Sequence, residues 1–234
     1  MTCAEGEIST ARKCTSSSSS KFVDGQYTYT YSSYDKGWSV ALTDKSSTNP
    51  VTTELCGTIN DKPIVSMQYM FQYSKATSID VSSFDTSHVT NMSYMFDSSA
   101  ATEIKGLENF DTSNVTDMSS MFASTKVTSL DLSGFDTSKV TDMHGMFYNS
   151  AATSLDLSSF DTSKVTDMHR MFFNNEKILT LDVSSFDTSN VTNMSDMFLW
   201  CKATTGYARS QKDADRFNAS SNKPAGLTFV VKSQ

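Results

Sequence analysis

The sequence predicts a repeat solenoid, and three observations lead to this prediction. A segment of the form Phe-Asp-Thr-Ser-x-Val-Thr-x-Met-x-x-Met-Phe occurs five times, and successive copies are 26, 25, 25 and 26 residues apart. A degenerate copy at 64–71 precedes them by one further period. Repeats of this length cannot bury an apolar face alone, so they must stack. The five copies are Phe84–Phe96, Phe110–Phe122, Phe135–Phe147, Phe160–Phe172 and Phe186–Phe198.

Each repeat has two parts. The Met-containing part has apolar residues at i, i+3, i+6 and i+7, which predicts a short α-helical or 3₁₀ turn. The other part is an apolar-polar-apolar triplet, which predicts a short strand opposite that turn. We therefore expect a right-handed stack of 25–26-residue rungs, each with one parallel strand and one helical turn. One repeat has 104–107 in this place, with an extra residue that predicts a bulge. The regular triplets are 79–81, 130–132, 155–157 and 181–183.

The repeats are flanked by segments of different composition. Residues 1–20 end in a run of serines and predict a flexible tail or linker. In 21–62, alternating segments at 27–31 and 38–42 predict a β-hairpin cap, followed by a short strand near 55–59. Residues 63–201 form about six rungs. Residues 202–234 predict a second cap, with a capping box at Ser210, a short helix to about Asn218 and a strand at 227–231. Caps cover the open ends of such arrays.

Composition excludes several classes of function. The 234 residues have a net charge of −7 and only four arginines, which argues against a nucleic-acid partner. No run approaches the roughly 18 apolar residues of a membrane span, so we expect no transmembrane segment. The chain has no Ser-His-Asp spacing, no Gly-rich phosphate loop and no His-Glu-x-x-His motif. We therefore expect no catalytic residues and no enzyme.

The four cysteines predict one disulfide. Cys3 and Cys14 bracket a short polar loop, and a bond between them would suit an exported protein. Cys56 and Cys201 lie at opposite ends of the repeats, where six rungs at roughly 4.8 Å each separate them by more than about 20 Å. Those two cannot pair. None of the spacings predicts a metal site.

Two acidic positions recur along the repeats. One follows the bend phenylalanine, and we expect its carboxylates to accept hydrogen bonds from backbone N–H groups. The other is the middle of the strand triplet, where the side chains point outward and Lys105 interrupts the series. This second column is either a solvated face or the best candidate ligand surface, with Ca²⁺ as the candidate cofactor. The bend column is Asp85, Asp111, Asp136, Asp161 and Asp187, and the strand column is Asp80, Asp131, Asp156 and Asp182.

Other recurring residues favour structural roles. Twelve of the 13 methionines form the Met-x-x-Met pairs, whose spacing predicts core packing rather than a Cu(I) site. His144 and His169 share one repeat position, but two ligands without a third favour a solvated pair over a metal site. A threonine column suggests ice binding as a minor alternative, although we place it at a bend rather than on a flat face. It comprises Thr86, Thr112, Thr137, Thr162 and Thr188.

The repeat, as at Phe110–Phe122, resembles that of the BspA-like class of leucine-rich-repeat bacterial surface proteins. Trp38–Met70 resembles the lead-in of that family, and Gly206–Lys232 resembles its closing segment. The resemblance thus covers about Trp38–Lys232. It implies export, a leucine-rich-repeat-like solenoid, and a role in surface attachment or host interaction. The family offers no catalytic residues to carry over.

We therefore expect a non-enzymatic, secreted or cell-surface binding or adhesion module of a bacterium. Its partner would be a protein or glycan of a host or neighbouring cell. The main alternative is a structural spacer that holds another module away from the cell. A carbohydrate-active β-solenoid enzyme is disfavoured, because its catalytic residues should break the repeat in one rung and none visibly does. Ice binding is the least favoured alternative.

Overall fold

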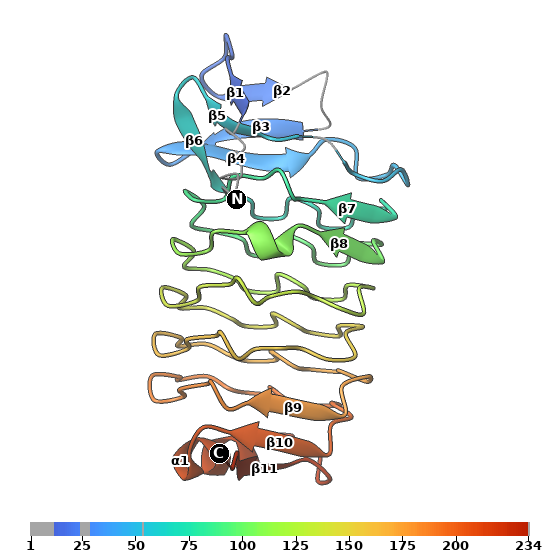
Figure 1. Ribbon diagram of the computed structural model, residues 1–234, viewed down its shortest axis with the longest axis vertical. Coiled ribbons are helices and arrows are strands. Elements are labelled where there is room, and N and C mark those ends of the chain that lie inside the picture. Colours follow the sequence, from blue (N-terminus) through green and yellow to red (C-terminus); the bar gives the residue numbers. More distant parts are fainter. Residues whose placement is uncertain (1–11, 24–28, 53, 234) are drawn as a thin grey trace, which may run out of the picture.

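The computed structural model describes residues 12–23, 29–52 and 54–233, and it shows a β-solenoid. The predicted stack of roughly 25-residue repeats is present, and it has about eight turns, whereas about six rungs were expected (Figure 1). A sheet covers the N-terminal end, and strands with a helix cover the other. We number the central turns 1 to 6 by their Met-x-x-Met pairs, from Met67/Met70 to Met194/Met197. Among the described residues, no helix has the length and apolar character needed to cross a membrane.

The N-terminal cap is one six-stranded sheet with the order β1-β5-β6-β4-β3-β2. The predicted hairpin is present as β3 and β4, although 24–28 lie outside the described residues. The cap is larger than predicted, because β1 pairs in parallel with β5 and β6 pairs with both β5 and β4. Residues 12–14, expected in a flexible tail, therefore belong to the sheet. The strands are β1 Arg12–Cys14, β2 Lys21–Val23, β3 Tyr29–Tyr34, β4 Gly37–Leu42, β5 Cys56–Ile59 and β6 Lys62–Ser66.

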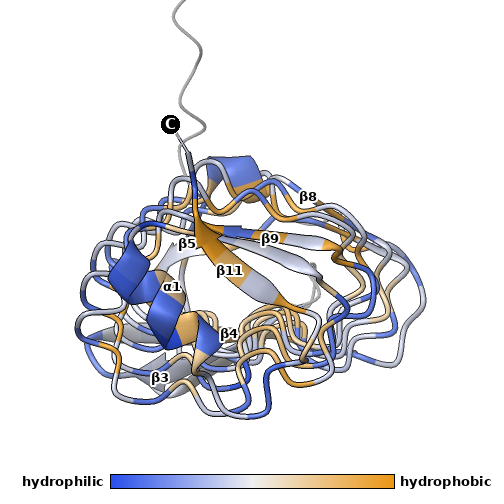
Figure 2. Cartoon of the chain, turned by 90° about the horizontal axis from the view of Figure 1, so that it is seen from below, coloured by the Kyte–Doolittle hydropathy of each residue, from blue (hydrophilic) through white to orange (hydrophobic). Residues whose placement is uncertain are grey.

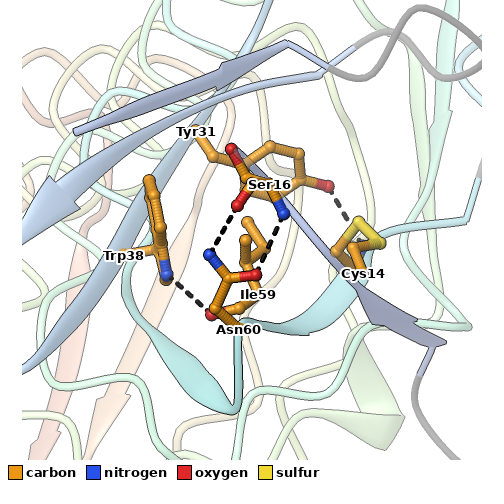
Figure 3. The surroundings of a disulfide bond; sticks show 7 residues. Cys14, Ser16, Tyr31, Trp38, Ile59 and Asn60 are labelled. Carbon is orange, nitrogen blue, oxygen red and sulfur yellow. Dashed lines mark hydrogen bonds between the residues drawn. A yellow bond between two sulfur atoms is a disulfide. The ribbon is translucent and has the colours of Figure 1, made fainter. Parts of the chain in front are cut away.

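A disulfide joins Cys14 of β1 to Cys56 of β5, with a Cα–Cα distance of 5.8 Å (Figure 3). The predicted bond between Cys3 and Cys14 is therefore wrong, and Cys3 itself lies outside the described residues. Sequence spacing could not show that β1 pairs with a strand 42 residues later. The bond sits against buried aromatic residues, and the Tyr31 hydroxyl accepts a hydrogen bond from the Cys56 N–H. Cys201 is a free, buried thiol, and burial raises its pKa.

The Met-containing segments are tight turns rather than the predicted helical turns. In turn 1, the N–H groups of Met70, Gln72 and Ser74 donate to carbonyls three residues earlier. The N–H groups of Met67, Tyr69, Phe71 and Tyr73 donate to the next turn, at the carbonyls of Asn91, Ser93, Met95 and Asp97. A helix would use all these N–H groups within one turn and leave the stack unlinked. Two residues per turn have positive φ, namely 69 and 73, 94 and 98, 120 and 124, 145 and 149, 170 and 174, and 196 and 200.

The side of the solenoid that carries the strand triplets, which we call the strand side, has fewer paired strands than predicted. It has a pair, β7 Ser78–Asp80 with β8 Glu103–Lys105, and a three-stranded sheet of β9 Thr180–Val183, β10 Thr205–Ala208 and β11 Thr228–Val231. The triplets 130–132 and 155–157 between them are not strands, and their N–H groups make no backbone hydrogen bond within the described residues. Instead of the predicted bulge, Gly106 (φ 87°) leads into the 3₁₀ helix η1 Leu107–Asn109. A side chain at Gly106 would overlap the backbone of Ser82.

Phenylalanines and methionines fill the interior of the stack. Eleven of the twelve paired methionines are fully buried and Met194 is partly buried, as the core prediction requires. The final phenylalanines of successive turns form a stacked column with centroid distances of 5.5–6.0 Å. Parallel turns bring identical side chains into register, so one position repeated along the chain becomes one column in the core. The column is Phe71, Phe96, Phe122, Phe147, Phe172 and Phe198.

The C-terminal cap consists of β10, β11 and the helix α1 Gln211–Asn218. The predicted N-cap is present, because the Ser210 hydroxyl accepts a hydrogen bond from the Asp213 N–H. Phe217 of α1 and Phe229 of β11 cover Phe198, the last ring of the core column. The Asn218 side chain bonds to both the N–H and the carbonyl of Phe229 and so blocks the outer edge of β11. Figure 2 shows α1 and β11 across this end.

Candidate binding groove

The bend carboxylates are part of the turn geometry. Each accepts a hydrogen bond from the backbone N–H of the serine two residues later, which is the role predicted for the column. Hydrogen bonds from Ser189, and then from Arg209, lower the pKa of Asp187 to about 2. The threonines beside this column are buried, with at most 2% of each exposed. They cannot form an ice-binding face.

The strand-column carboxylates lie at the surface and, like the bend carboxylates, accept backbone hydrogen bonds. Each accepts a hydrogen bond from the serine N–H two residues later. Hydrogen bonds from those serines lower the pKa values of Asp80, Asp131 and Asp156. Asp182 also binds the Lys232 ammonium at 2.5 Å. A hollow of about 200 Å³ lies between Asp156 and Asp182.

The described residues contain no group of three or more His, Cys, Asp or Glu side chains arranged to hold a metal ion. The strand column therefore supplies one carboxylate per turn rather than a cluster. Calcium prefers six to eight oxygen ligands. The geometry thus gives no support to the Ca²⁺ alternative, and the column remains a prediction as a ligand surface.

A third polar column lies on the side of the solenoid that the Met-containing tight turns form, which we call the turn side. The sequence prediction missed this column. Each carboxylate or amide oxygen accepts a hydrogen bond from the N–H two residues later. In turns 4 and 5 the residue two later is His144 or His169, and its Nδ1 also lies 2.8 Å from the same carboxylate oxygen. The Asp-x-His spacing was visible in the sequence. The column is Asn91, Asp117, Asp142, Asp167 and Asn193.

The two histidines form an ordered, half-buried pair rather than the predicted solvated pair. Their rings stack with centroids 4.8 Å apart and an interplanar angle of 9°. The Tyr94 hydroxyl lies 3.3 Å from His144 Nε2, although the two residues are 50 positions apart in the sequence. The hydrogen bond to Asp142 raises the pKa of His144, burial opposes this, and the charges of Asp142, Asp167 and Asp117 add to the increase.

Beside this pair is a polar groove of about 400 Å³. Its floor belongs to turn 3, where the outward residues are Ser120, Ala123 and Ser124. At the position of Ala123 the two neighbouring turns have the larger residues Asp97 and Tyr148, so the small residue of turn 3 leaves a hollow between them. The large residues around the groove are Tyr73, Tyr94, Asp97, His144, Tyr148, His169 and Arg170.

Aromatic side chains continue along the turn side beyond the groove. Tyr148 stacks on Phe173 with centroids 4.8 Å apart, and Phe173 meets the edge of Trp200. Tyr73 and Trp200 are 61% and 62% exposed. A second hollow of about 610 Å³ lies beside Trp200, at the junction with the C-terminal cap. We favour the groove over this hollow because it contains charged, imidazole and aromatic groups on one regular surface.

The described residues of the groove show neither of two arrangements that are common in hydrolytic enzymes. Glycosidases use a pair of carboxylates, whereas Asp97 is the one carboxylate among the described residues that line the groove. A Ser-His-Asp hydrolase places a serine at the free imidazole nitrogen, but His144 Nε2 faces the Tyr94 hydroxyl.

The comparisons with known proteins agree with the repeat architecture. The sequence pattern of the family described as "Mycoplasma protein of unknown function, DUF285" matches residues 45–153 and 124–222. The two overlapping matches together span more than half of the chain. No curated protein and no solved structure matches the chain.

Proposed function

The chain belongs to the family of Mycoplasma proteins of unknown function, DUF285, and we propose that it is a non-enzymatic module that binds a protein or glycan partner through its turn side. One observation supports this most directly. Inward positions of the turns repeat, whereas outward positions differ from turn to turn and form a groove. A solenoid that only needed to stack would gain nothing from this outward variety. A groove that recognises one partner is built from such differences.

We place this module outside the cell, either secreted or at the cell surface. The Cys14–Cys56 disulfide supports this location, because disulfides persist in oxidising compartments. The resemblance of the repeat to BspA-like leucine-rich-repeat surface proteins supports it too, and it favours a role in attachment. Two capped ends also fit a structural spacer, which remains the alternative. A spacer would show no binding that depends on one face.

The test is to probe an array of glycans and host surface proteins with the full chain and two variants. The groove variant carries His144→Ser, Tyr148→Ala and Arg170→Ser, each of which introduces the residue that turn 3 has at that position. The strand-side variant carries Asp131→Ser, Asp156→Ser and Asp182→Ser. Circular dichroism and thermal unfolding check that both variants fold.

We expect the groove variant to bind its partner at least tenfold more weakly and the strand-side variant to bind like the parent. Loss of binding in the strand-side variant alone would place the site at the strand column and overturn the proposal. Equal binding by all three proteins would overturn the placement of the site in the groove, and no partner on the array would favour the spacer.

A further inference from the structure

The groove interrupts a column of side chains that otherwise continues along the turn side. The fifth residue after the first Met of each pair forms this column. It contains Asp97 in turn 2, Ala123 in turn 3, Tyr148 in turn 4 and Phe173 in turn 5. Tyr148 and Phe173 stack at the spacing of the turns, 4.8 Å. One face of the Tyr148 ring is therefore covered, and the other faces the layer that Ala123 leaves empty.

The empty layer has the thickness of a ring. Adjacent turns are about 4.8 Å apart, so Asp97 and Tyr148 are separated by about twice that distance. A six-membered ring that enters this layer stacks on Tyr148 and takes the place of the missing side chain. Aromatic faces attract aliphatic C–H groups and other rings at such distances. The column thus fits a ring-shaped ligand.

The polar groups around this layer suit hydroxyl groups. Asp97 is almost buried, and its carboxylate is positioned by Gln72 Nε2 and the Ser98 hydroxyl, both at 2.9 Å. A carboxylate has about four acceptor sites, so further sites remain for ligand hydroxyls. On the other wall, the guanidinium of Arg170, whose Nε lies 3.6 Å from Asp196, can donate from its other nitrogens, and the Tyr94 hydroxyl can donate or accept a hydrogen bond. Vicinal hydroxyls on a saturated ring match such mixed donors and acceptors.

The groove is less suited to an extended peptide. The floor N–H groups of Ser120 and Ser124 donate to turn 4, and the N–H of Ala123 donates within turn 3. No open strand edge is therefore available in the floor for pairing with a peptide backbone. A phosphate-bearing ligand is disfavoured by the carboxylates of Asp97, Asp142 and Asp167 around the groove.

We propose that the groove is a carbohydrate-binding site that stacks one pyranose ring of a neutral oligosaccharide on Tyr148, in the layer left by Ala123. This inference rests on the proposed function, because it names the ligand class of the same groove. Asp97, Tyr94 and Arg170 bind the hydroxyls of that ring. Tyr73, which is exposed at the far end, supplies a second surface for a neighbouring sugar.

The test is titration calorimetry of the full chain with neutral tetrasaccharides of glucose, galactose and N-acetylglucosamine, and with adenosine as a planar control ligand. The key variant is Ala123→Tyr, which fills the empty layer with the residue of the next turn. Tyr148→Ala removes the stacking surface. Asp131→Ser on the strand side is the matched control. Thermal unfolding shows that each variant folds.

We expect at least one tetrasaccharide to bind the parent and Asp131→Ser equally, and to bind Ala123→Tyr and Tyr148→Ala at least tenfold more weakly. Unchanged binding to Ala123→Tyr would overturn the inference, as would binding of adenosine alone or of no tetrasaccharide. A protein partner that depends on the groove, with no saccharide binding, would leave the proposed function intact and contradict only the carbohydrate assignment.

Discussion

The two long sides of the solenoid are built from the same repeats but are held together differently. On the turn side, parallel bridges connect six successive turns through Ser66, Asn91, Asp117, Asp142, Asp167 and Asn193. On the strand side, strand pairing stops after β8 and resumes at β9. Between them, the hydroxyls of Ser159 and Ser185 bridge to the carbonyls of Leu132 and Leu157.

The difference shows where sequence variation is tolerated. On the turn side the backbone provides the cohesion, so outward side chains are free to differ and to form a groove. On the strand side, polar side chains hold neighbouring backbone groups, and the aspartates are occupied by serine N–H groups. Four experiments sharpen or break this comparison.

The largest effect is expected inside the turn side. Met143→Asp buries a carboxylate without a partner, because Met143 is fully buried. We expect the free energy of unfolding to fall by about 3–5 kcal/mol. The matched control is Thr141→Asp at an exposed position, which should change it by less than about 1 kcal/mol. Urea unfolding measures both, and similar midpoints would show that the methionines do not support the stack.

Acid should destabilise the chain through its aspartates. The folded-state pKa values of Asp131, Asp156 and Asp187 lie below the usual value of 3.8, and that of Asp187 is about 2. Their contribution to stability is present above pH 3.8 and is lost as the pH falls toward 2. We expect a steady melting temperature between pH 5 and 6 and a progressive fall below about pH 4.

The control for acid unfolding is one double variant that carries both Asp131→Asn and Asp156→Asn. Asparagine keeps the oxygen that accepts the serine N–H, as Asn91 does on the turn side, but it does not titrate. We expect this variant to melt near the parent at pH 7 and to lose less stability in acid. An identical acid profile would show that the strand column contributes nothing to the pH dependence.

Hydrogen exchange compares the two sides directly. The N–H groups of Ser120 and Phe122 donate to turn 4, whereas those of Asp131 and Asp156 make no backbone hydrogen bond within the described residues. We expect exchange at the first pair to be at least about 100-fold slower. Mass spectrometry of peptides from the two sides measures this. Equal protection would mean that the strand side is as cohesive as the turn side.

The smallest effect is expected at His144. Its folded-state pKa is raised above 6.5 by Asp142, so its contribution to stability is present below pH 6.5 and is lost as the pH rises through the folded pKa. We expect the parent to lose on the order of 1 °C in melting temperature between pH 6 and 8. His144→Gln should remove this slope. The groups that face the imidazole are Asp142, Asp117, Asp167, Tyr94 and His169.

The sequence predictions for the Met-containing segments and for two of the strand triplets were wrong, and each error has a physical cause. Apolar residues at i, i+3, i+6 and i+7 fit consecutive tight turns as well as a helix, because both bring every third or fourth residue to the same side. The tight turns form because alternate N–H groups donate to the next turn of the solenoid instead of within a helix. The triplets at 130–132 and 155–157 have the same pattern as 181–183, yet pairing with β10 makes only the last of them a strand.

The sequence by itself determined the solenoid, its period, its buried methionine and phenylalanine columns and the helix of the C-terminal cap. Each of these depends on periodicity or on contacts between residues near in sequence. The tertiary structure decided the Cys14–Cys56 pairing and the Tyr94–His144 contact, whose partners are 42 and 50 residues apart. It also placed Ala123 between Asp97 and Tyr148, and so formed the groove. A short-range pattern fixes which side of a turn a residue occupies, but only the stacking of whole turns fixes what lies above and below it.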